Sequence, residues 1–269
     1  MIDRKRVERS FHRGASDYDD HTPVQKRVLD KLLDILSKNI SAPPDNLLDV
    51  GCGTGLLLES LSGKYHDATL SGIDIAPNML YQAAERLSDR ATLLLGDAEK
   101  LPFSDSSFNL VLSTSVFQWL EECDACFAEV RRVLMEDGVF CFALFGRGTF
   151  YELHESWQLA LKHCGRSIPA DHDGTHRFHS INDIRSALLK FGFSDVKVKS
   201  VSEVVWYEDL PKLLRAIKRV GAGSARPPSG GGLGWRSVLH EMASIYKTRF
   251  GTEKGVPASY KVIYGFGRV

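Results

Sequence analysis

The sequence predicts an α/β fold with a mostly parallel β-sheet. From residue 46 onward, short apolar runs alternate with segments of helical periodicity, which is the pattern of repeated βαβ units. A glycine-rich loop at 51–55 lies between one of these runs and a predicted helix start. Hydrophobic residues make up 43% of the 269 residues and charged residues 25%, as in ordinary globular domains.

The N-terminal part is expected to be an arm followed by a helix. Residues 1–21 are polar and mixed in charge, which suits an arm or lid better than a core segment. A helix is predicted over 22–38, because apolar residues recur at helical spacing and Thr22 with Gln25 matches a capping box. Arm and helix together form the first predicted domain, residues 1–40.

Residues 41–201 are predicted to form the core. Strands are expected at 46–50, 68–75, 91–95, 108–113, 139–145 and 194–201. Helices are expected at 56–61, at 77–87, along an apolar stripe from Cys126 to Leu134, at 150–163 and at 181–191. Ser180 is predicted to cap the last of these helices, and Gly192 to close it.

The remaining residues are predicted to form an insertion and a closing strand. Residues 202–258 are interpreted as a helical, basic insertion, and their glycine- and proline-rich stretch 221–232 argues for a mobile loop. The segment 259–269 is assigned to the final strand of the core, because 259–266 is rich in Tyr, Val and Ile.

Charge and cysteine usage narrow the class of protein. Lys+Arg and Asp+Glu are both 34, so net charge gives no reason to expect nucleic acid or a membrane surface as partner. The cysteines are odd in number and irregularly spaced, which indicates reduced thiols. With no signal peptide and no apolar run long enough to cross a bilayer, the expected location is the cytoplasm. No His and Cys spacing suggests a metal, and Cys123-x-x-Cys126 lacks a second pair.

The glycine loop and two aspartates predict a nucleotide-type site. Gly51, Gly53 and Gly55 follow a strand and precede a helix, where glycine permits a tight turn and the helix start offers free N–H groups. Asp74 ends the second strand, where a carboxylate can accept hydrogen bonds from both hydroxyls of a ribose. Asp97 ends the third, where its side chain can accept from an adenine amine. All three loops are expected at the carboxyl edge of one sheet.

A dinucleotide-binding dehydrogenase is the rival interpretation. Its fingerprint requires glycine at the position of Leu56, where the small residue allows close packing around a pyrophosphate. Leucine there favours a ligand without a pyrophosphate, such as S-adenosylmethionine.

These features resemble the class I methyltransferase family over roughly residues 45–145. The resemblance implies a Rossmann-like, seven-stranded, mostly parallel sheet with an antiparallel last strand after a helical insertion, and S-adenosylmethionine as cofactor. It also implies that Asp49 supports the loop and the methionine amine, and that Ser115 to Trp119 lies beside the transferable methyl. The alternatives are a structural acid at Asp49 and a core aromatic at Trp119. The implied cofactor-binding set is Asp49, Gly51, Gly53, Gly55, Asp74, Ile75, Met79, Asp97, Ala98, Ser115 and Trp119.

Further segments are similar to the malonyl-acyl-carrier-protein O-methyltransferase family of biotin synthesis. They are the arm at 11–19 and the segments 149–157, 177–178, 217–222 and 260–262. The resemblance implies methylation of the free carboxylate of malonyl-acyl-carrier protein or malonyl-coenzyme A. The alternatives are a methyltransferase acting on a quinone precursor or other small molecule, and a non-catalytic module that binds the cofactor and scaffolds a partner.

A malonyl acceptor sets its own requirements. Its carboxylate, with an ordinary pKa of about 4, is ionised at neutral pH and can attack a sulfonium methyl without a general base. Arginine suits such a carboxylate because its planar fork binds in two places, so Arg177 is the first candidate and Arg147 the second. The alternative for Arg177 is a surface ion pair. Tyr18 is expected to close over the site from the arm, and the alternative is ordinary packing of a terminal segment.

A basic helix face offers a candidate contact for an acidic carrier protein. Residues 210–236 contain six Lys and Arg residues without one Asp or Glu. On a helix, Lys212, Arg215 and Arg219 share a face opposite the apolar side chains. Such a face can steer and dock an acidic protein, and the alternative is an ordinary solvated surface.

Overall fold

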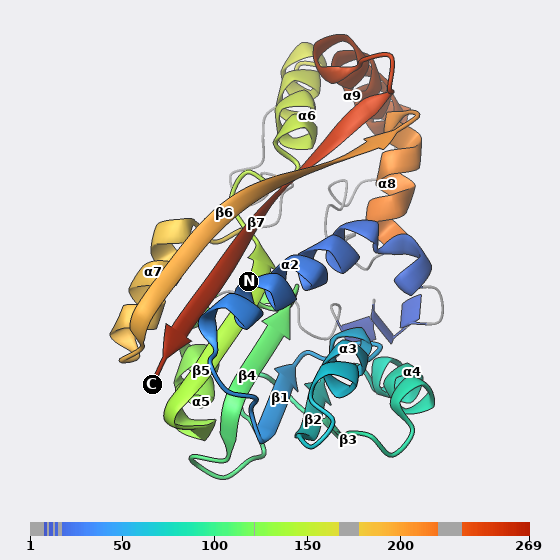
Figure 1. Cartoon of the computed structure of the whole chain (residues 1–269). Coiled ribbons are helices and arrows are strands. Elements are labelled where there is room, and N and C mark those ends of the chain that lie inside the picture. The colour runs from blue at the N-terminus through green and yellow to red at the C-terminus, as the bar shows by residue number, and fades with distance from the viewer. Residues whose placement is uncertain are drawn as a thin grey trace. The chain divides into compact units, whose positions relative to one another are not determined.

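The fold is built on one seven-stranded sheet (Figure 1). The computed structural model describes residues 8–9, 11–12, 14–15, 18–120, 122–166, 178–219 and 233–269. The strands are β1 Asn46–Val50, β2 Thr69–Asp74, β3 Thr92–Leu95, β4 Phe108–Thr114, β5 Leu134–Phe145, β6 Ser194–Tyr207 and β7 Val256–Arg268.

The strand order is β3-β2-β1-β4-β5-β7-β6. The pairs β1–β2, β2–β3, β1–β4 and β4–β5 are parallel, and β7 is antiparallel to β5. This confirms the predicted fold class. Chain order runs outward in opposite directions from β1 and β4, so a crevice forms at their carboxyl ends, which is where open α/β sheets bind ligands.

The helices largely follow the predicted periodicity. They are α2 Pro23–Asn39, α3 Leu56–Lys64, α4 Pro77–Leu87, α5 Asp124–Val133, α6 Tyr151–His163, α7 Ile181–Lys190, α8 Leu210–Arg219 and α9 Leu233–Phe250, with 3-10 turns η2 Asp19–His21 and η3 Phe117–Trp119. The cap of α7 is confirmed, because Ser180 and Asp183 exchange side-chain and backbone hydrogen bonds.

Four local predictions are wrong. Strand β5 begins at Leu134, which the sequence interpretation assigned to the preceding helix, rather than at residue 139. Thr22 does not cap α2 with its side chain, because its backbone, with φ −116° and ψ 48°, is not in the extended conformation of a helix cap. Its hydroxyl donates to the Asp19 carbonyl oxygen. Strand β6 continues to Tyr207, since Val204, Val205 and Trp206 maintain strand propensity beyond the predicted end. Strand β7 begins at Val256, before the predicted start at residue 259.

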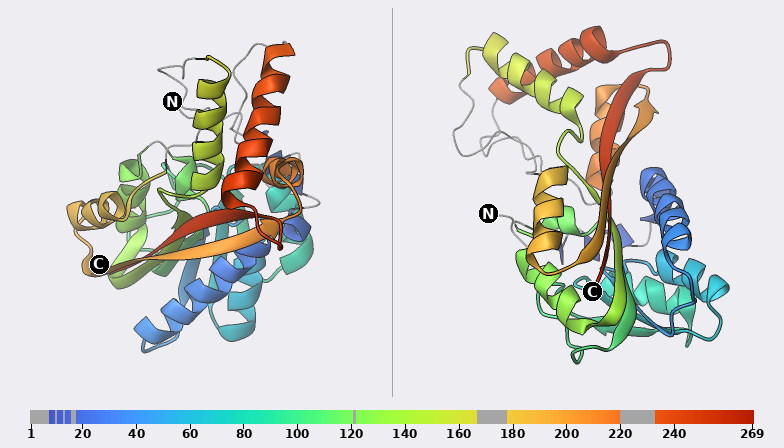
Figure 2. Two further views of the ribbon diagram at one scale, coloured as in Figure 1. Left: turned by 90° about the horizontal axis from the view of Figure 1, so that it is seen from above. Right: turned by 60° about the vertical axis from the view of Figure 1, so that its left-hand side comes forward.

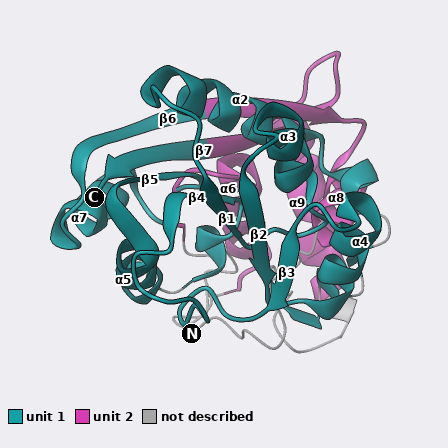
Figure 3. Cartoon of the chain, turned by 60° about the horizontal axis from the view of Figure 1, so that its bottom comes forward, with its two compact units in different colours: residues 1–146, 179–201, 262–269 teal, residues 147–178, 202–261 magenta. Residues whose placement is uncertain are grey.

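Contacts divide the chain into two compact units (Figure 3). Unit 1 comprises 1–146, 179–201 and 262–269, and unit 2 comprises 147–178 and 202–261. Residues 147–178, which the sequence interpretation assigned to the core, therefore cluster with the insertion. The long strands β6 and β7 lie side by side (Figure 2). Each contributes residues to both units (Figure 3).

Unit 1 has an apolar core rich in phenylalanine. Phe117 of η3, Phe127 of α5 and Phe140 and Phe142 of β5 are each fully buried, with ring centroids 4.4 to 5.9 Å apart. Edge-to-face aromatic pairs of this kind add to the stabilisation from burial. The cluster fixes η3, which carries the segment after β4 that the sequence assigns to the site.

The cysteines, the apolar helices and the potential metal ligands were examined by the sequence interpretation and can be located in the structure. All five cysteines are free thiols, four of them buried. In the part of the chain that the structure describes, no helix is long and apolar enough to cross a membrane. Over the same residues, His, Cys, Asp and Glu form no group of three that could hold a metal ion.

Candidate active site

A pocket in unit 1 opens at the carboxyl ends of β1, β2, β3 and β4. It contains about 820 Å³ of space unfilled by atoms, part of it open to solvent. The predicted set contributes Gly51, Gly53, Asp74, Ile75, Met79, Asp97, Ala98, Ser115 and Trp119, and Tyr18 lies in the wall as well. The remaining lining residues are Phe11, Ile73, Gly96, Thr114, Val116 and Leu120.

The glycine loop is shaped by left-handed backbone conformations. Gly51, Gly53 and Gly55 have φ values of +73°, +52° and +82°, which side-chain-bearing residues adopt only at a cost. A Cβ on Gly53 would meet no atom within 4 Å, so Gly53 presents bare backbone to the pocket. Gly55 is not in the pocket lining. A Cβ there would lie 3.0 Å from Leu87 and 3.1 Å from Ala83, so this glycine lets α3 pack against α4.

Asp74 holds the loop from the end of β2. Its Oδ2 accepts from the Gly53 N–H at 2.9 Å, and its Oδ1 accepts from the Ala76 N–H at 2.8 Å. Burial raises the pKa of this carboxyl, and the backbone donors work against that rise. Each oxygen keeps a second lone pair, so the carboxylate can still accept from two hydroxyl groups in the pocket.

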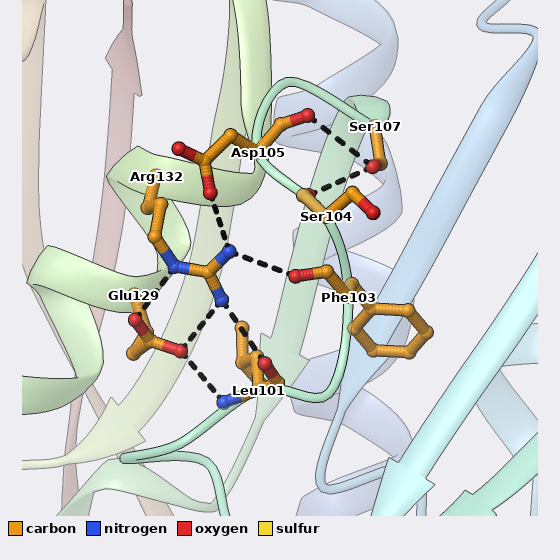
Figure 4. Close-up of polar contacts among 7 residues, drawn as sticks. All are labelled: Leu101, Phe103, Ser104, Asp105, Ser107, Glu129 and Arg132. Atoms are coloured by element: carbon orange, nitrogen blue, oxygen red, sulfur yellow. Dashed lines mark hydrogen bonds and ion pairs between the residues drawn. The ribbon is translucent and has the colours of Figure 1, made fainter.

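Asp97 lies at the end of β3 in the same wall. Its Oδ1 accepts from the Glu99 N–H at 2.9 Å, which turns the backbone after the strand. The following loop is anchored by Arg132 of α5 (Figure 4), whose guanidinium donates to the carbonyl oxygens of Leu101 at 3.0 Å and Phe103 at 2.8 Å. Glu129 pairs with Arg132 and accepts from the Leu101 N–H at 2.7 Å. The loop after β3 is therefore anchored to α5.

Asp49 is buried in β1 behind the lining. The residue is 1% exposed, and its Oδ1 has no hydrogen-bond partner among the described residues. Burial, with a smaller effect from the charge of Asp74, raises the pKa of Asp49 to about 8. A cation that binds beside this buried carboxyl would stabilise its ionised form.

Part of the pocket wall is aromatic. The rings of Phe11 and Trp119 are 5.5 Å apart and nearly perpendicular, and Phe11 lies 6.1 Å from Tyr18. Ser115, directly after β4, has φ +59°, and its buried hydroxyl lacks a hydrogen-bond partner within the described residues. Backbone strain of this kind concentrates at ligand-binding sites.

The sequence interpretation missed several lining side chains, among them Phe11, Thr114 and Leu120. Thr114 and Leu120 directly flank the predicted segment Ser115 to Trp119, so widening that segment by one residue at each end would have included them. Phe11 carried one usable signal, a large apolar side chain in an otherwise polar arm.

The three residues predicted to act on the substrate lie in different parts of the chain. Tyr18 lines the pocket, where burial and the charge of Asp74 raise the pKa of its hydroxyl. Arg147 is an exposed residue of unit 2. Arg177 lies outside the described residues, as does the predicted mobile loop 221–232.

The predicted partner face lies on α8 in unit 2. Leu213 and Ile217 are buried, whereas Lys212, Arg215 and Arg219 are exposed, as the helical spacing predicted. Lys212 forms an ion pair with Glu208 one turn earlier.

The pocket fits an adenosine ligand with a charged amino-acid end. Gly53 leaves space where a Cβ would project, Asp74 retains acceptor capacity, and Asp49 is a buried carboxyl with an orphaned oxygen. These are the features that S-adenosylmethionine requires for its ribose and its ammonium group.

Comparison with known proteins gives the same result. A family model described as a methyltransferase domain matches residues 48–142. The malonyl-[acyl-carrier protein] O-methyltransferase of Geobacter sulfurreducens is 46% identical, over 100% of this chain and 100% of its own length. The biotin biosynthesis bifunctional protein of Teredinibacter turnerae is 29% identical, over 97% of this chain and 46% of that relative. The structure of Haemonchus contortus phosphoethanolamine N-methyltransferase 2 with S-adenosyl-L-methionine superimposes with a TM-score of 0.55, at 18% identity, over 89% of this chain and 52% of that one; this likeness concerns the fold.

Sheet order, glycine loop and matched domain together define a class I methyltransferase that uses S-adenosylmethionine. Identity over the full length then specifies the group within that class. The chain belongs to the malonyl-[acyl-carrier protein] O-methyltransferase family.

Proposed function

We propose that this enzyme transfers the methyl group of S-adenosylmethionine to the free carboxylate of a malonyl group carried by acyl-carrier protein, as a step of biotin synthesis in the cytoplasm. The observation that carries the proposal is the 46% identity to a malonyl-[acyl-carrier protein] O-methyltransferase over the full length of both chains. The free thiols are in keeping with a reducing compartment.

In this proposal the pocket holds the cofactor. Asp74 accepts hydrogen bonds from the ribose hydroxyls, and Asp97 with the Ala98 peptide binds the adenine edge. Asp49 offers negative charge to the methionine ammonium, and Gly53 allows its backbone to approach the ligand. Ile75 and Met79 provide apolar contact from the start of α4, while Ser115 and Trp119 flank the methyl.

The bound cofactor supplies an electrophilic methyl on a sulfonium. The protein then has to bring an anionic oxygen into line with it. A malonyl carboxylate is already ionised at neutral pH, so no general base is needed, and orientation in a site shielded from water can supply several kcal/mol. The aromatic wall of Phe11, Tyr18 and Trp119 provides such shielding.

The carboxylate needs a partner once it leaves water. Arg177, with Arg147 as the second candidate, is proposed to bind it through two parallel N–H···O bonds. Tyr18 is proposed to close over the acceptor. The exposed cations of α8 are proposed to receive the acidic carrier protein.

Two measurements test the proposal. Methyl transfer from labelled S-adenosylmethionine is followed with malonyl-acyl-carrier protein, malonyl-coenzyme A and a quinone precursor as acceptors. Formation of a base-labile ester on the malonyl carrier is the expected result. Transfer only to the quinone precursor would overturn the assignment in favour of a small-molecule methyltransferase, and cofactor binding without any transfer would favour a non-catalytic module.

The site itself is tested by cofactor affinity. Replacing both Asp74 and Asp97 by alanine is expected to weaken binding of S-adenosylhomocysteine by at least roughly a hundredfold, because two hydrogen-bonding carboxylates are lost. Unchanged affinity in that variant would show that the nucleoside binds elsewhere.

A further inference from the structure

A polar network joins the N-terminal arm to the glycine loop. Asp19 of η2 accepts a hydrogen bond from the Thr54 hydroxyl at 2.8 Å and forms an ion pair with Arg86 of α4. Thr54 lies between the second and third glycines of the loop. The arm and the cofactor loop therefore share one set of contacts, although they are far apart in sequence.

Arg86 is the centre of this network. One of its terminal nitrogens, Nη1, donates to both the carbonyl oxygen and the hydroxyl of Thr54, at 2.6 and 2.9 Å. The other, Nη2, pairs with Asp19, and Nε lies 3.4 Å from Glu59 of α3. A guanidinium can satisfy all of these acceptors at once because its donors form a rigid fork, whereas a lysine ammonium cannot.

The network is partly shielded from solvent. The side chains of Arg86 and Asp19 are each 24% exposed, and Thr54 is 5% exposed. Charge-assisted hydrogen bonds in such surroundings are screened less than those of a surface pair.

The same arm also reaches the pocket. Tyr18, next to Asp19 in the chain, lines the pocket, and so does Phe11. Ala15 packs with Ala76 and Met79 at the start of α4, against which Phe11 and Tyr18 also lie. Nearby, the Asn78 side chain donates to the His12 carbonyl oxygen at 2.8 Å.

From these contacts we propose that Arg86 is a positioning residue that fastens the arm to the glycine loop and so keeps Tyr18 and Phe11 over the bound cofactor. Arg86 does not line the pocket, so it acts through Asp19 and Thr54. The inference rests on the proposed cofactor site, and it is independent of which acceptor is methylated.

Cofactor release tests the proposal. The dissociation rate and Kd of S-adenosylhomocysteine are measured for the wild type, Arg86→Gln, Arg86→Lys, Asp19→Asn and the Arg86→Gln/Asp19→Asn double variant. Arg86→Gln is expected to raise the dissociation rate roughly tenfold, as for loss of a charge-assisted contact, with partial recovery in Arg86→Lys. Because the two residues act through one network, the double variant is expected to dissociate no faster than Arg86→Gln.

The matched control is Arg90→Gln. Arg90 lies just after the end of α4, the helix that carries Arg86. It donates to the Ser62 carbonyl oxygen at 3.0 Å and makes no contact with the described arm residues. The proposal would be overturned by any of three results. These are a wild-type dissociation rate in Arg86→Gln, an equal effect in Arg90→Gln, and additive effects of Asp19→Asn and Arg86→Gln.

Thr54→Val, which removes only the hydroxyl, gives a milder variant that is also expected to raise the dissociation rate. Absence of any binding by the wild type would contradict the proposed cofactor site, and is thereby distinguished from failure of the network.

Discussion

At the scale of single residues, the raised pKa of Asp49 predicts that cofactor affinity depends on pH. Its pKa of about 8 in the ligand-free protein means that it is largely protonated at neutral pH, whereas a bound ammonium favours its ionised form. Affinity for S-adenosylhomocysteine should therefore rise between about pH 6 and pH 8, by at most about tenfold per pH unit. Calorimetric titration over this range checks the expectation.

The Asp49→Asn variant separates this effect from other titrations. This variant should bind S-adenosylhomocysteine more weakly, and its affinity should not rise with pH in the same way. The control Asp45→Asn, at an exposed position, should behave like the wild type.

The native state of the ligand-free protein keeps a proton on Asp49 up to about pH 8, while the unfolded chain loses it near pH 4. Stability of the wild type should therefore fall as pH rises through this window, and Asp49→Asn should flatten the fall. A wild-type affinity that is constant with pH would contradict the raised pKa.

Gly53 allows a second test at this scale. An alanine there has to adopt φ +52°, and its Cβ would project into the pocket space. Gly53→Ala should cost about 1–2 kcal/mol of stability from backbone strain and should also weaken S-adenosylhomocysteine binding.

Gly192 is the matched control for Gly53. It has φ +78°, and a Cβ there likewise meets nothing within 4 Å, but it lies after α7 and away from the pocket lining. Gly192→Ala should lose similar stability in chemical denaturation and keep cofactor affinity. Equal affinities in the two variants would argue against a ligand at the loop.

At the scale of elements, Arg132 of α5 joins a helix to the loop after β3 (Figure 4). Arg132→Met keeps the aliphatic stem but removes donors to two carbonyl oxygens and to Glu129. The free energy of unfolding should fall by about 1–3 kcal/mol. Arg131→Met, one position earlier on the helix, is the control and should change stability far less.

The contribution of Arg132 to the free energy of unfolding is also expected to depend on pH. Its guanidinium holds the pKa of Glu129 below the ordinary value, so the stabilisation is present above about pH 4.3 and is lost as pH falls through the lowered pKa. The stability difference between wild type and Arg132→Met should shrink below that point. A difference that persists undiminished in strong acid would contradict the ion-pair account.

The basic face of α8 provides another test at the element scale. Reversing Lys212, Arg215 and Arg219 to Glu should raise KM for malonyl-acyl-carrier protein roughly tenfold at low salt and have little effect with malonyl-coenzyme A. The same reversal at exposed Lys26, Lys31 and Lys38 of α2 changes net charge equally and serves as control. Equal effects of both triple variants would indicate nonspecific charge rather than a docking face.

At the scale of the whole molecule, sequence patterns predicted the sheet and several residues that line one pocket at its edge. Gly53, Asp74 and Asp97 follow consecutive parallel strands, and the carboxyl ends of such strands meet at one edge by topology alone. Phe11 could not be placed in this way, because its position depends on tertiary contacts of the arm with α4. The network around Arg86 was missed for the same reason, since nothing near this residue in the sequence indicates its partners.

The ends of helices and strands were harder to predict than the elements themselves. Thr22 has the residue type of a helix cap, yet its backbone, with φ −116° and ψ 48°, does not adopt the extended conformation that a cap requires. The extra length of β6 and β7 reflects pairing of each strand with a neighbour, which period-2 patterns of short segments underestimate.

The passage of β6 and β7 through both units constrains how unit 2 could be exchanged between relatives. Two of the four boundaries of unit 2 fall inside strands, after Val201 in β6 and after Lys261 in β7. A chimera spliced at those points would join two half-strands from different parents, whose pleat and register have to agree. Recombination is therefore expected to succeed when crossovers are moved into the turns that follow Tyr207 and precede Val256, so that each parental strand is inherited whole.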